Sequence, residues 1–181
     1  MKRLILPIFL ISGLFACRGY GPGPCWQYNN GDNYTSNYPI SRSQIPYLKT
    51  YYSHYKPSLQ IDEKNLQIKW IIKANPNDLT ILKNHIKFMK ERILEGFTPR
   101  KWDRLFVDYA KLKKYIHENI TQTNNSLIIL QKADNKCAFD FAKAHALEVK
   151  NDFFNGNTFK NYSNIAITLE NKPECKGYFN E

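Results

Sequence analysis

The fold class can be inferred from residues 66–95, whose sequence is LQIKWIIKANPNDLTILKNHIKFMKERILE. Apolar residues at positions 66, 68, 70 and 72 first recur at every second position, which is typical of a strand with one buried face. Asn75-Pro76-Asn77-Asp78 then ends the strand and caps a helix. Apolar residues at positions 79, 82, 86, 89 and 93 share one face of that helix. Gly96 is expected just beyond its C-terminus.

A second helix is predicted directly after the first. Thr98 is a suitable cap and Pro99 suits the first helical position. The apolar stripe of this helix comprises Trp102, Leu105, Phe106, Tyr109, Leu112 and Ile116. Because the connection is short, the helices within residues 78–119 are expected to form an antiparallel hairpin.

The remaining residues supply further strands and one more helix. Residues 127–130 form an apolar run typical of a buried strand, and a third helix is expected after Asp134 or Asn135. Residues 165–169 alternate as another strand, and residues 175–179 could add an edge strand. The predicted fold class is therefore α+β: a small sheet with the helical hairpin and a further helix packed on one face. No internal repeat is recognisable.

The N-terminus has the pattern of an export signal. Lys2 and Arg3 precede an uncharged run that ends at Ala16. The run is shorter than the ~20 residues that a helix needs to span a bilayer, and it fits the apolar part of a signal peptide. Leu14 is too large for the general signal peptidase, which requires a small residue at the third position before the cut.

The four residues Leu14-Phe15-Ala16-Cys17 resemble the lipobox of bacterial lipoproteins, although Phe15 is larger than the residue usual at its position. The resemblance covers residues 1–17 only. It implies that residues 1–16 are removed and that Cys17 carries acyl chains such as palmitate, which anchor the protein in the membrane. Arg18 stands where an Asp would imply retention in the inner membrane. The resemblance therefore implies an outer-membrane lipoprotein, with the periplasmic face favoured over the cell surface.

Residues 17–58 are predicted to form a lipidated tether and a tyrosine-rich segment. This stretch contains eight of the twelve tyrosines, and its glycines and prolines disfavour long helices. Aromatic residues are rare in disordered linkers, so residues 44–56 are expected either to pack on their own domain or to contact a partner or glycan. The α+β domain is assigned to residues 59–181 and to the periplasm.

Three cysteines remain if Cys17 is acylated. A pair of cysteines in the oxidising periplasm is expected to be bonded, and Cys137 and Cys175 are assigned to each other because both lie in the predicted domain. Cys25 is left over and could reach another chain. The cysteine spacing matches no zinc site, and neither a metal nor a cofactor is expected.

The predicted mature chain is basic, because loss of Lys2 and Arg3 lowers the formal charge only from +10 to +8. A candidate basic binding face comprises Lys83, Lys87, Lys90, Lys111 and Lys114. These residues form either the solvated side of amphipathic helices or a surface for anionic lipid or another envelope protein of acidic character. Nucleic acid is not an expected partner in this compartment.

The sequence contains no recognisable catalytic motif. His117-Glu118 begins like the metalloprotease motif H-E-x-x-H, but the second histidine is missing. Cys137 and His145 would lie about 12 Å apart along one helix, too far for a nucleophile and its base. We therefore expect a lipid-anchored, non-enzymatic binding or accessory component of an envelope, secretion or pilus assembly. The alternatives are an envelope hydrolase, whose acids and histidine would converge in a cleft, and a surface-exposed lipoprotein that contacts host or glycan.

Overall fold

The computed structural model describes residues 52–98, 100–156 and 160–179. These residues form an antiparallel sheet of four strands in the order β1-β2-β4-β3. The two hairpins β1–β2 and β3–β4 meet at the central pair β2–β4, in which Trp70 lies opposite Ile129. The strands are β1 Lys56–Asp62, β2 Gln67–Lys73, β3 Ile116–Gln122 and β4 Ser126–Ala133.

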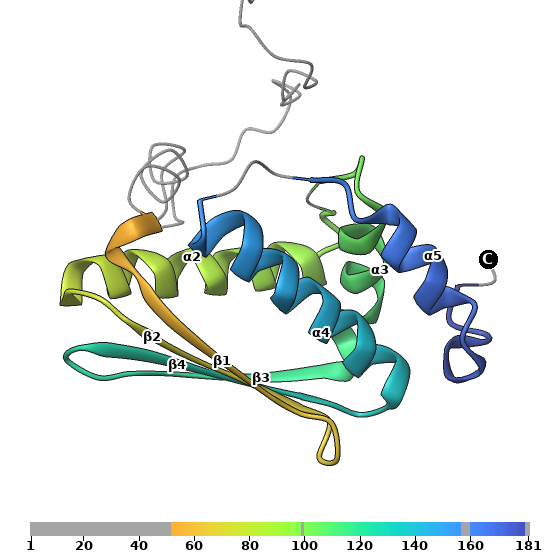
Figure 1. Cartoon of the computed structure of the whole chain (residues 1–181), viewed down its shortest axis with the longest axis horizontal. Coiled ribbons are helices and arrows are strands. Elements are labelled where there is room, and N and C mark those ends of the chain that lie inside the picture. Colours follow the sequence, from red (N-terminus) through yellow and green to blue (C-terminus); the bar gives the residue numbers. More distant parts are fainter. Residues whose placement is uncertain (1–51, 99, 157–159, 180–181) are drawn as a thin grey trace, which may run out of the picture. The chain divides into compact units, whose positions relative to one another are not determined.

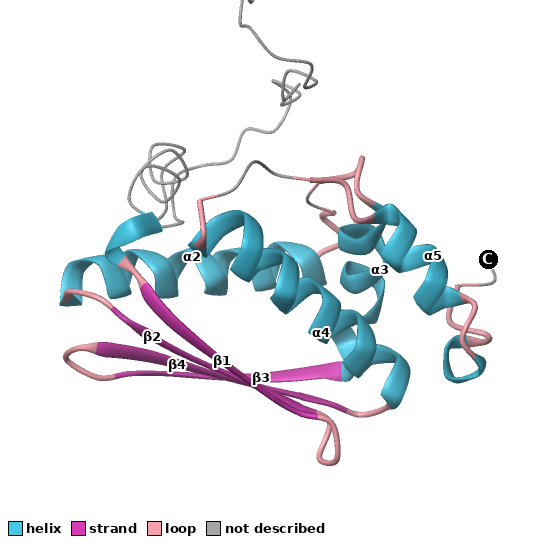
Figure 2. Cartoon of the chain, in the orientation of Figure 1, coloured by secondary structure: helices cyan, strands magenta, loops and turns pink. Residues whose placement is uncertain are grey.

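Helices cover one face of the sheet (Figures 1 and 2). They are α2 Pro76–Leu94, α3 Arg104–Leu112, α4 Lys136–Val149, its π-helical extension Lys150–Phe154, and α5 Ser163–Glu170. α3 packs mainly against α4 and α5, whereas α2 contacts β3, β4 and the 3-10 turn Lys113–Tyr115. α2 and α3 do not pack along each other, so the predicted antiparallel helical hairpin is not formed. The predicted α+β class, with its helices on one face of a small sheet, is confirmed. No helix within the described ranges combines the length and the apolar character needed to cross a membrane.

The core lies between the sheet and the helices. Alternate side chains of the central strands point toward the helices, so Ile68, Trp70 and Ile72 of β2 are buried, as are Leu127 and Ile129 of β4. The helices contribute fully buried side chains, among them Leu79, Leu105, Phe139 and Phe141. The other alternate positions of the strands lie on the opposite face, which no described helix covers (Figure 1) and which we call the uncovered face.

The domain contains two similar hairpin–helix units. A 3-10 turn, two strands and a helix follow each other twice, and corresponding elements begin 60, 59 and 60 residues apart: Lys56 and Ile116, Gln67 and Ser126, Pro76 and Lys136. Both helices are capped by asparagine side chains, since Asn75 accepts a hydrogen bond from the amide of Asp78 and Asn135 from that of Ala138. The sequence does not reveal the repeat because unlike residues fill its equivalent positions.

Two predicted strands are wrong. Residues 165–169 belong to helix α5, in which Ala166 and Leu169 are buried while Ile165 and Ile167 are each 42% exposed. The two buried positions are three residues apart, as in a helix, whereas the alternating isoleucines that suggested a strand lie on the more exposed side. Residues 175–179 form no edge strand, because Pro173–Cys175 is a 3-10 turn and Gly177 has a φ of +89°.

The second predicted helix is shorter than expected at both ends. α3 begins after Asp103, whose side chain accepts a hydrogen bond from the amide of Leu105, so Thr98 is not its cap. The helix ends at Leu112, and Ile116 begins β3 instead of continuing the stripe. β1 and β3 were not predicted because their sequences, KPSLQID and IHENITQ, contain few apolar residues. The boundary predicted at residue 59 consequently falls inside β1.

Two finer predictions agree with the structure. Gly96 follows α2 with a φ of +93°, and the amide of Phe97 donates to the carbonyl of Arg92, as in a typical helix C-terminus. Cys137 and Cys175 form a disulfide with their Cα atoms 5.0 Å apart. This bond ties the first turn of α4 to the turn Pro173–Cys175. Cys17, Cys25 and the predicted signal peptide lie outside the described residues.

Candidate binding surfaces

Three of the predicted basic residues form a row along α2. Lys83, Lys87 and Lys90 are spaced by four and three residues, so their side chains leave the helix on one side. Thr80 continues this row, and its hydroxyl accepts a hydrogen bond of 3.2 Å from the side chain of Gln122 at the end of β3. The row therefore runs beside β3. Within the described part of the chain, none of these lysines has an ion pair.

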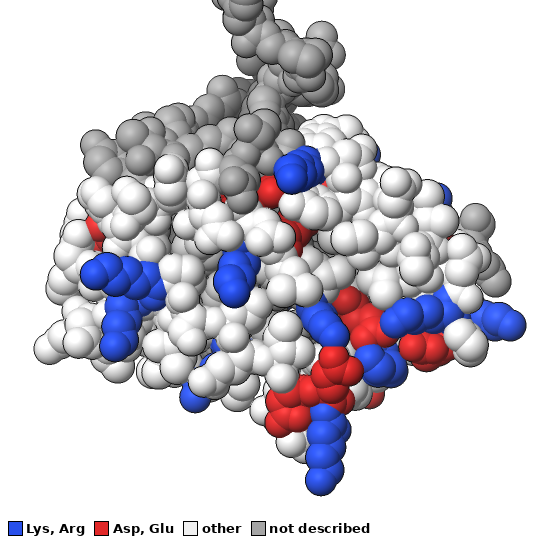
Figure 3. Space-filling model, in the orientation of Figure 1, with Lys and Arg blue, Asp and Glu red and all other residues white. Residues whose placement is uncertain are grey.

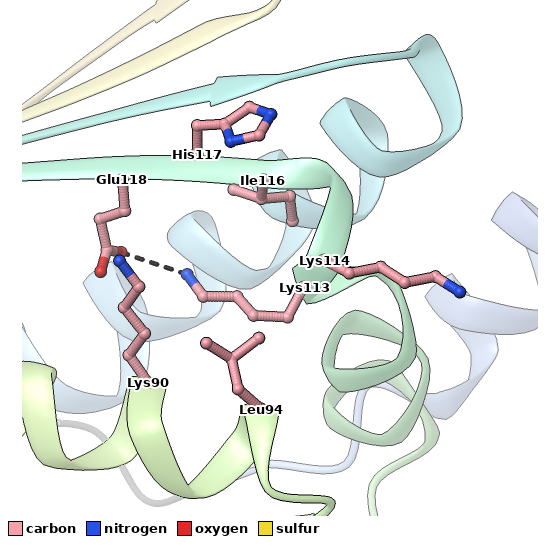
Figure 4. Close-up of a pocket in the computed structure, with 7 residues that line it drawn as sticks. All are labelled: Lys90, Leu94, Lys113, Lys114, Ile116, His117 and Glu118. Atoms are coloured by element: carbon pink, nitrogen blue, oxygen red, sulfur yellow. Dashed lines mark hydrogen bonds and ion pairs between the residues drawn. The ribbon is translucent and has the colours of Figure 1, made fainter.

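A groove with a volume of about 280 Å³ lies at one end of this row (Figure 4). Lys90 and the 58%-exposed Leu94 line its α2 side. The opposite side is formed by the turn Lys113–Tyr115 and the beginning of β3, through Lys113, Lys114, Ile116, His117 and Glu118. Figure 4 shows the Lys90 side chain extending toward Glu118. The lining is therefore basic and partly apolar.

Part of this lining belongs to a buried polar network. Lys113 Nζ donates at 3.3 Å to the Tyr109 hydroxyl and to Glu118 Oε2, and Gln131 Nε2 donates to the same Oε2 at 2.8 Å. Burial disfavours the ammonium group, but Tyr109 and Glu118 outweigh this effect and raise the pKa of Lys113. Glu118 Oε1 is buried without a hydrogen-bond partner among the residues that the structure describes. A ligand could therefore supply a donor to Oε1.

The structure separates the last two residues of the predicted basic face. Lys114 lines the groove, with its Nζ 5.1 Å from the centre of the Tyr115 ring. Lys111 instead lies 3.5 Å from Asp108, and its Nζ is 5.9 Å from the centre of the Phe179 ring. Lys83, Lys87 and Lys90 thus lie on one side of α2. Lys114 lies at the groove with its side chain directed away from Lys90 (Figure 4), and Lys111 belongs to the surface of α3.

The uncovered face of the sheet is a second basic surface, and sequence analysis missed it. Lys56 lies directly opposite Lys73, and Lys69 lies opposite Leu130, two residues from Lys132. Like charges that face each other across two strands destabilise a sheet. No ion pair joins any of these four lysines to another described residue. We call Lys56, Lys69, Lys73 and Lys132 the sheet-face lysines.

The centre of this face is apolar. Ile71 lies opposite Ile128, and Leu130 follows Ile128 on the same side of β4; all three are half-buried. Asp62 is the one acidic residue at the outward positions of the four strands, and its carboxylate accepts hydrogen bonds from Asn65. The face therefore combines an apolar centre with four positive charges: Lys56, Lys73 and Lys132 are exposed, whereas Lys69 is half-buried beside Leu130.

Acidic side chains are more frequent on other parts of the surface than on this face of the sheet. In the view of Figure 3 they gather near the β1–β2 turn, where basic side chains lie among them. Glu63 in this turn pairs with Lys143, and Asp140 pairs with both Lys136 and Lys172. Glu63 and the buried Asp140 are thus paired with lysines, whereas the sheet-face lysines have no acidic partner among the described residues.

Three carboxyl groups converge where α3 meets α4 and its π-helical extension. Arg100 pairs with Glu148, and its guanidinium lies 3.6 Å from Asp152. Burial raises the pKa of Glu148 to about 9; Arg100 opposes this shift, while Asp103 and Asp152 add to it. The Tyr162 hydroxyl donates a hydrogen bond of 2.9 Å to Asp152.

This carboxyl cluster is sealed from solvent. The exposed fractions of Asp103, Glu148 and Asp152 are 0%, 1% and 3%. His145, one helical turn before Glu148, stacks on the Tyr109 ring, and burial lowers its pKa to about 3. Acids and a histidine therefore approach each other, but not in a cleft open to a substrate. The described residues also hold no group of three or more potential metal ligands.

Comparisons with known proteins identify no relative of this chain. No family model matches it, and neither a curated protein nor a solved structure matches it.

Proposed function

We propose that this chain is an exported, lipid-anchored protein whose α+β domain binds an anionic surface of the cell envelope without catalysing a reaction. The lipobox-like residues 14–17 support the anchor, and the basic sheet face supports the binding partner. The proposed location is the outer membrane, with the domain in the periplasm, where anionic lipid headgroups are abundant.

The sheet-face lysines are the observation that carries this proposal. A second copy of the domain packed on this face would bring lysines against lysines, so an anionic occupant is favoured. Each lysine near an anionic membrane contributes about 1 kcal/mol, so four contribute about 4 kcal/mol. This free energy corresponds to a dissociation constant of about 1 mM. Such weak binding becomes effective when an anchor holds the domain close to the membrane.

The buried carboxyl cluster argues against a hydrolase. General acid–base catalysis requires a carboxyl group within hydrogen-bond reach of the substrate. Asp103, Glu148 and Asp152 instead contact Arg100, one another and Tyr162 inside the domain. We infer that the cluster holds α3 against α4.

Vesicle binding tests the proposed membrane face. The protein is residues 17–181 carrying Cys17→Ser, so neither the signal segment nor acyl chains contribute to binding. It should sediment with phosphatidylglycerol vesicles and not with phosphatidylcholine vesicles, and added salt should weaken binding because it screens exposed charges.

Two charge-reversal variants locate the binding surface. Lys56→Glu/Lys73→Glu/Lys132→Glu should abolish sedimentation. Lys83→Glu/Lys87→Glu/Lys90→Glu changes the net charge equally but acts on α2, and it should retain most of the binding. Equal loss in both variants would show that net charge alone drives binding, and the proposed face would then be wrong.

A further inference from the structure

We propose that the outer edge of β3 and the lysine row of α2 bind an extended acidic polypeptide segment, which joins the sheet as an additional strand beside β3. In this mode, the backbone of the segment pairs with an edge strand while its alternate side chains enter a groove. The inference does not depend on the proposed membrane face, because the groove lies on the side of the sheet that the helices cover.

The edge of β3 offers backbone groups for such pairing. Among the described residues, β3 pairs with β4 alone. The amide of Thr123 donates to the carbonyl of Ser126, and the amide of Asp134 donates to that of Tyr115. Odd-numbered residues of β3 therefore form hydrogen-bonded pairs with β4, and the even-numbered residues turn their N–H and C=O groups away. These outward residues are Glu118, Ile120 and Gln122, together with Ile116, whose N–H already donates to the carbonyl of Lys113.

α2 forms a wall along this edge and runs in the opposite direction. Thr80 contacts Gln122 at one end, and Lys90 and Glu118 line the groove at the other. The helix rises ~15 Å between Thr80 and Lys90, and the strand covers ~14 Å between Glu118 and Gln122. The two lengths agree, so Lys83 and Lys87 fall between the ends. Lys83 and Lys90 are only partly exposed, as expected for a groove wall.

The charges of the wall select an acidic segment. No acidic residue occurs between Lys83 and Lys90 in the sequence, and the three lysines of the row have no ion pair within the described ranges. Consider a segment that pairs antiparallel with β3. Those of its residues that lie opposite Glu118, Ile120 and Gln122 direct their side chains toward the helices, and successive side chains on that side are ~7 Å apart. The lysines are ~6 and ~4.5 Å apart along the helix axis. Acidic residues at alternate positions can therefore each reach a lysine.

Glu118 is an independent sign that the groove receives a ligand. Its side chain is 3% exposed and lines the groove, yet Oε1 has no hydrogen-bond partner in the described part of the chain. A buried acceptor without a donor is destabilising. An amide or hydroxyl group of the bound segment can supply this donor, and the exposed Leu94 beside it offers an apolar contact.

An alternating peptide tests this inference. The probe is an eight-residue peptide of alternating Glu and Val with blocked termini, added to isotope-labelled residues 17–181 carrying Cys17→Ser. The matched control is the same peptide methylated at the Glu backbone nitrogens, which keeps every charge but removes the donors that would face β3. The amide resonances of Glu118, Ile120 and Gln122 should shift in a saturable manner, and methylation should weaken binding at least tenfold.

Protein variants separate this groove from the membrane face. Lys83→Glu/Lys87→Glu/Lys90→Glu should weaken peptide binding at least tenfold, whereas Lys56→Glu/Lys73→Glu/Lys132→Glu should leave it unchanged. Equal affinity for the methylated peptide, shifts confined to the sheet face, or no binding would overturn the inference. Tighter binding of an eight-residue oligothymidylate at the same resonances would also overturn it, in favour of a nucleic acid. The peptide comparison needs no protein variant, so the test holds even if a variant fails to fold.

Discussion

Glu148→Gln should make the domain more stable than the wild type at alkaline pH, although it replaces a partner of Arg100. Burial keeps the Glu148 carboxyl protonated in the folded state up to a pKa of about 9, against 4.5 for a free Glu side chain. A raised pKa in the folded state means that this contribution to stability is complete below pH 4.5 and is lost as the pH rises toward 9. Gln is neutral at every pH and avoids this loss.

The size of the effect follows from proton linkage. Between pH 4.5 and 9 the folded chain holds one proton at Glu148 that the unfolded chain has released. The free energy of unfolding of the wild type should therefore fall by about 1.4 kcal/mol per pH unit from this residue. From pH 5 to pH 8 the wild type should lose about 4 kcal/mol relative to the variant. Asp108, whose pKa burial raises to about 6, affects both proteins alike and cancels in the difference.

Urea unfolding at pH 5, 6, 7 and 8 measures this difference. Glu91→Gln, at an exposed position of α2, is the matched control and should follow the pH dependence of the wild type. The argument from burial fails if the difference in the free energy of unfolding between the wild type and Glu148→Gln is the same at every pH. It also fails if the wild type becomes more stable relative to the variant as the pH rises, because Glu148 would then be ionised and paired with Arg100.

Three further predictions concern the anchor, the disulfide and the repeated helix cap. Cys17→Ser should block lipid attachment and processing, which metabolic labelling with palmitate and mass determination of the N-terminus would detect; continued acylation would disprove the lipobox. Cys137→Ala/Cys175→Ala should lower the free energy of unfolding by about 4 kcal/mol in urea titrations, as expected for a sequence separation of 38 residues, and an unchanged value would exclude the bond. Asn75→Ala and Asn135→Ala should each cost about 1 kcal/mol by the same assay, because both remove an N-terminal cap. A cost near zero at either position would show that this cap is dispensable.

The parts of the fold that sequence analysis predicted are those in which several signals coincide. β2, α2 and α4 each have a clear apolar period, both helices begin after an asparagine cap, and each element lies near its predicted position. β1 and β3 are edge strands, and edge strands have fewer buried positions and a weaker period. α5 is short, and its isoleucines alternate on the exposed side, so the two buried positions gave too little information.

The candidate surfaces were predictable to different degrees. The lysine row of α2 follows from helical spacing within one element, and the structure keeps Lys83, Lys87 and Lys90 together. Lys69 and Lys73 alternate with buried residues of β2, so the sequence could have indicated that both lie on the outer face of this strand. Lys132 joins them only through the pairing of β2 with β4. Arg100, Asp103, Glu148 and Asp152 come from distant segments and belong to no common motif. Their convergence depends on the packing of α3 against α4, which no local pattern indicates.

Most of the charged residues that the fold buries are acidic, whereas many of the basic residues remain exposed. Seven charged residues are buried as whole residues in the described part of the chain, and six of them are acidic: Asp78, Asp103, Asp108, Asp140, Glu148 and Asp152, with Lys113 as the single base. The side chain of Glu118 is buried as well. Glu148 also carries a proton at neutral pH, because its pKa is about 9, so the folded domain holds one negative charge fewer than its composition implies. The lysines of the sheet face and of α2 remain outside without acidic partners among the described residues. An approaching anion therefore meets a more positive surface than the composition alone implies, and this attraction should weaken with added salt.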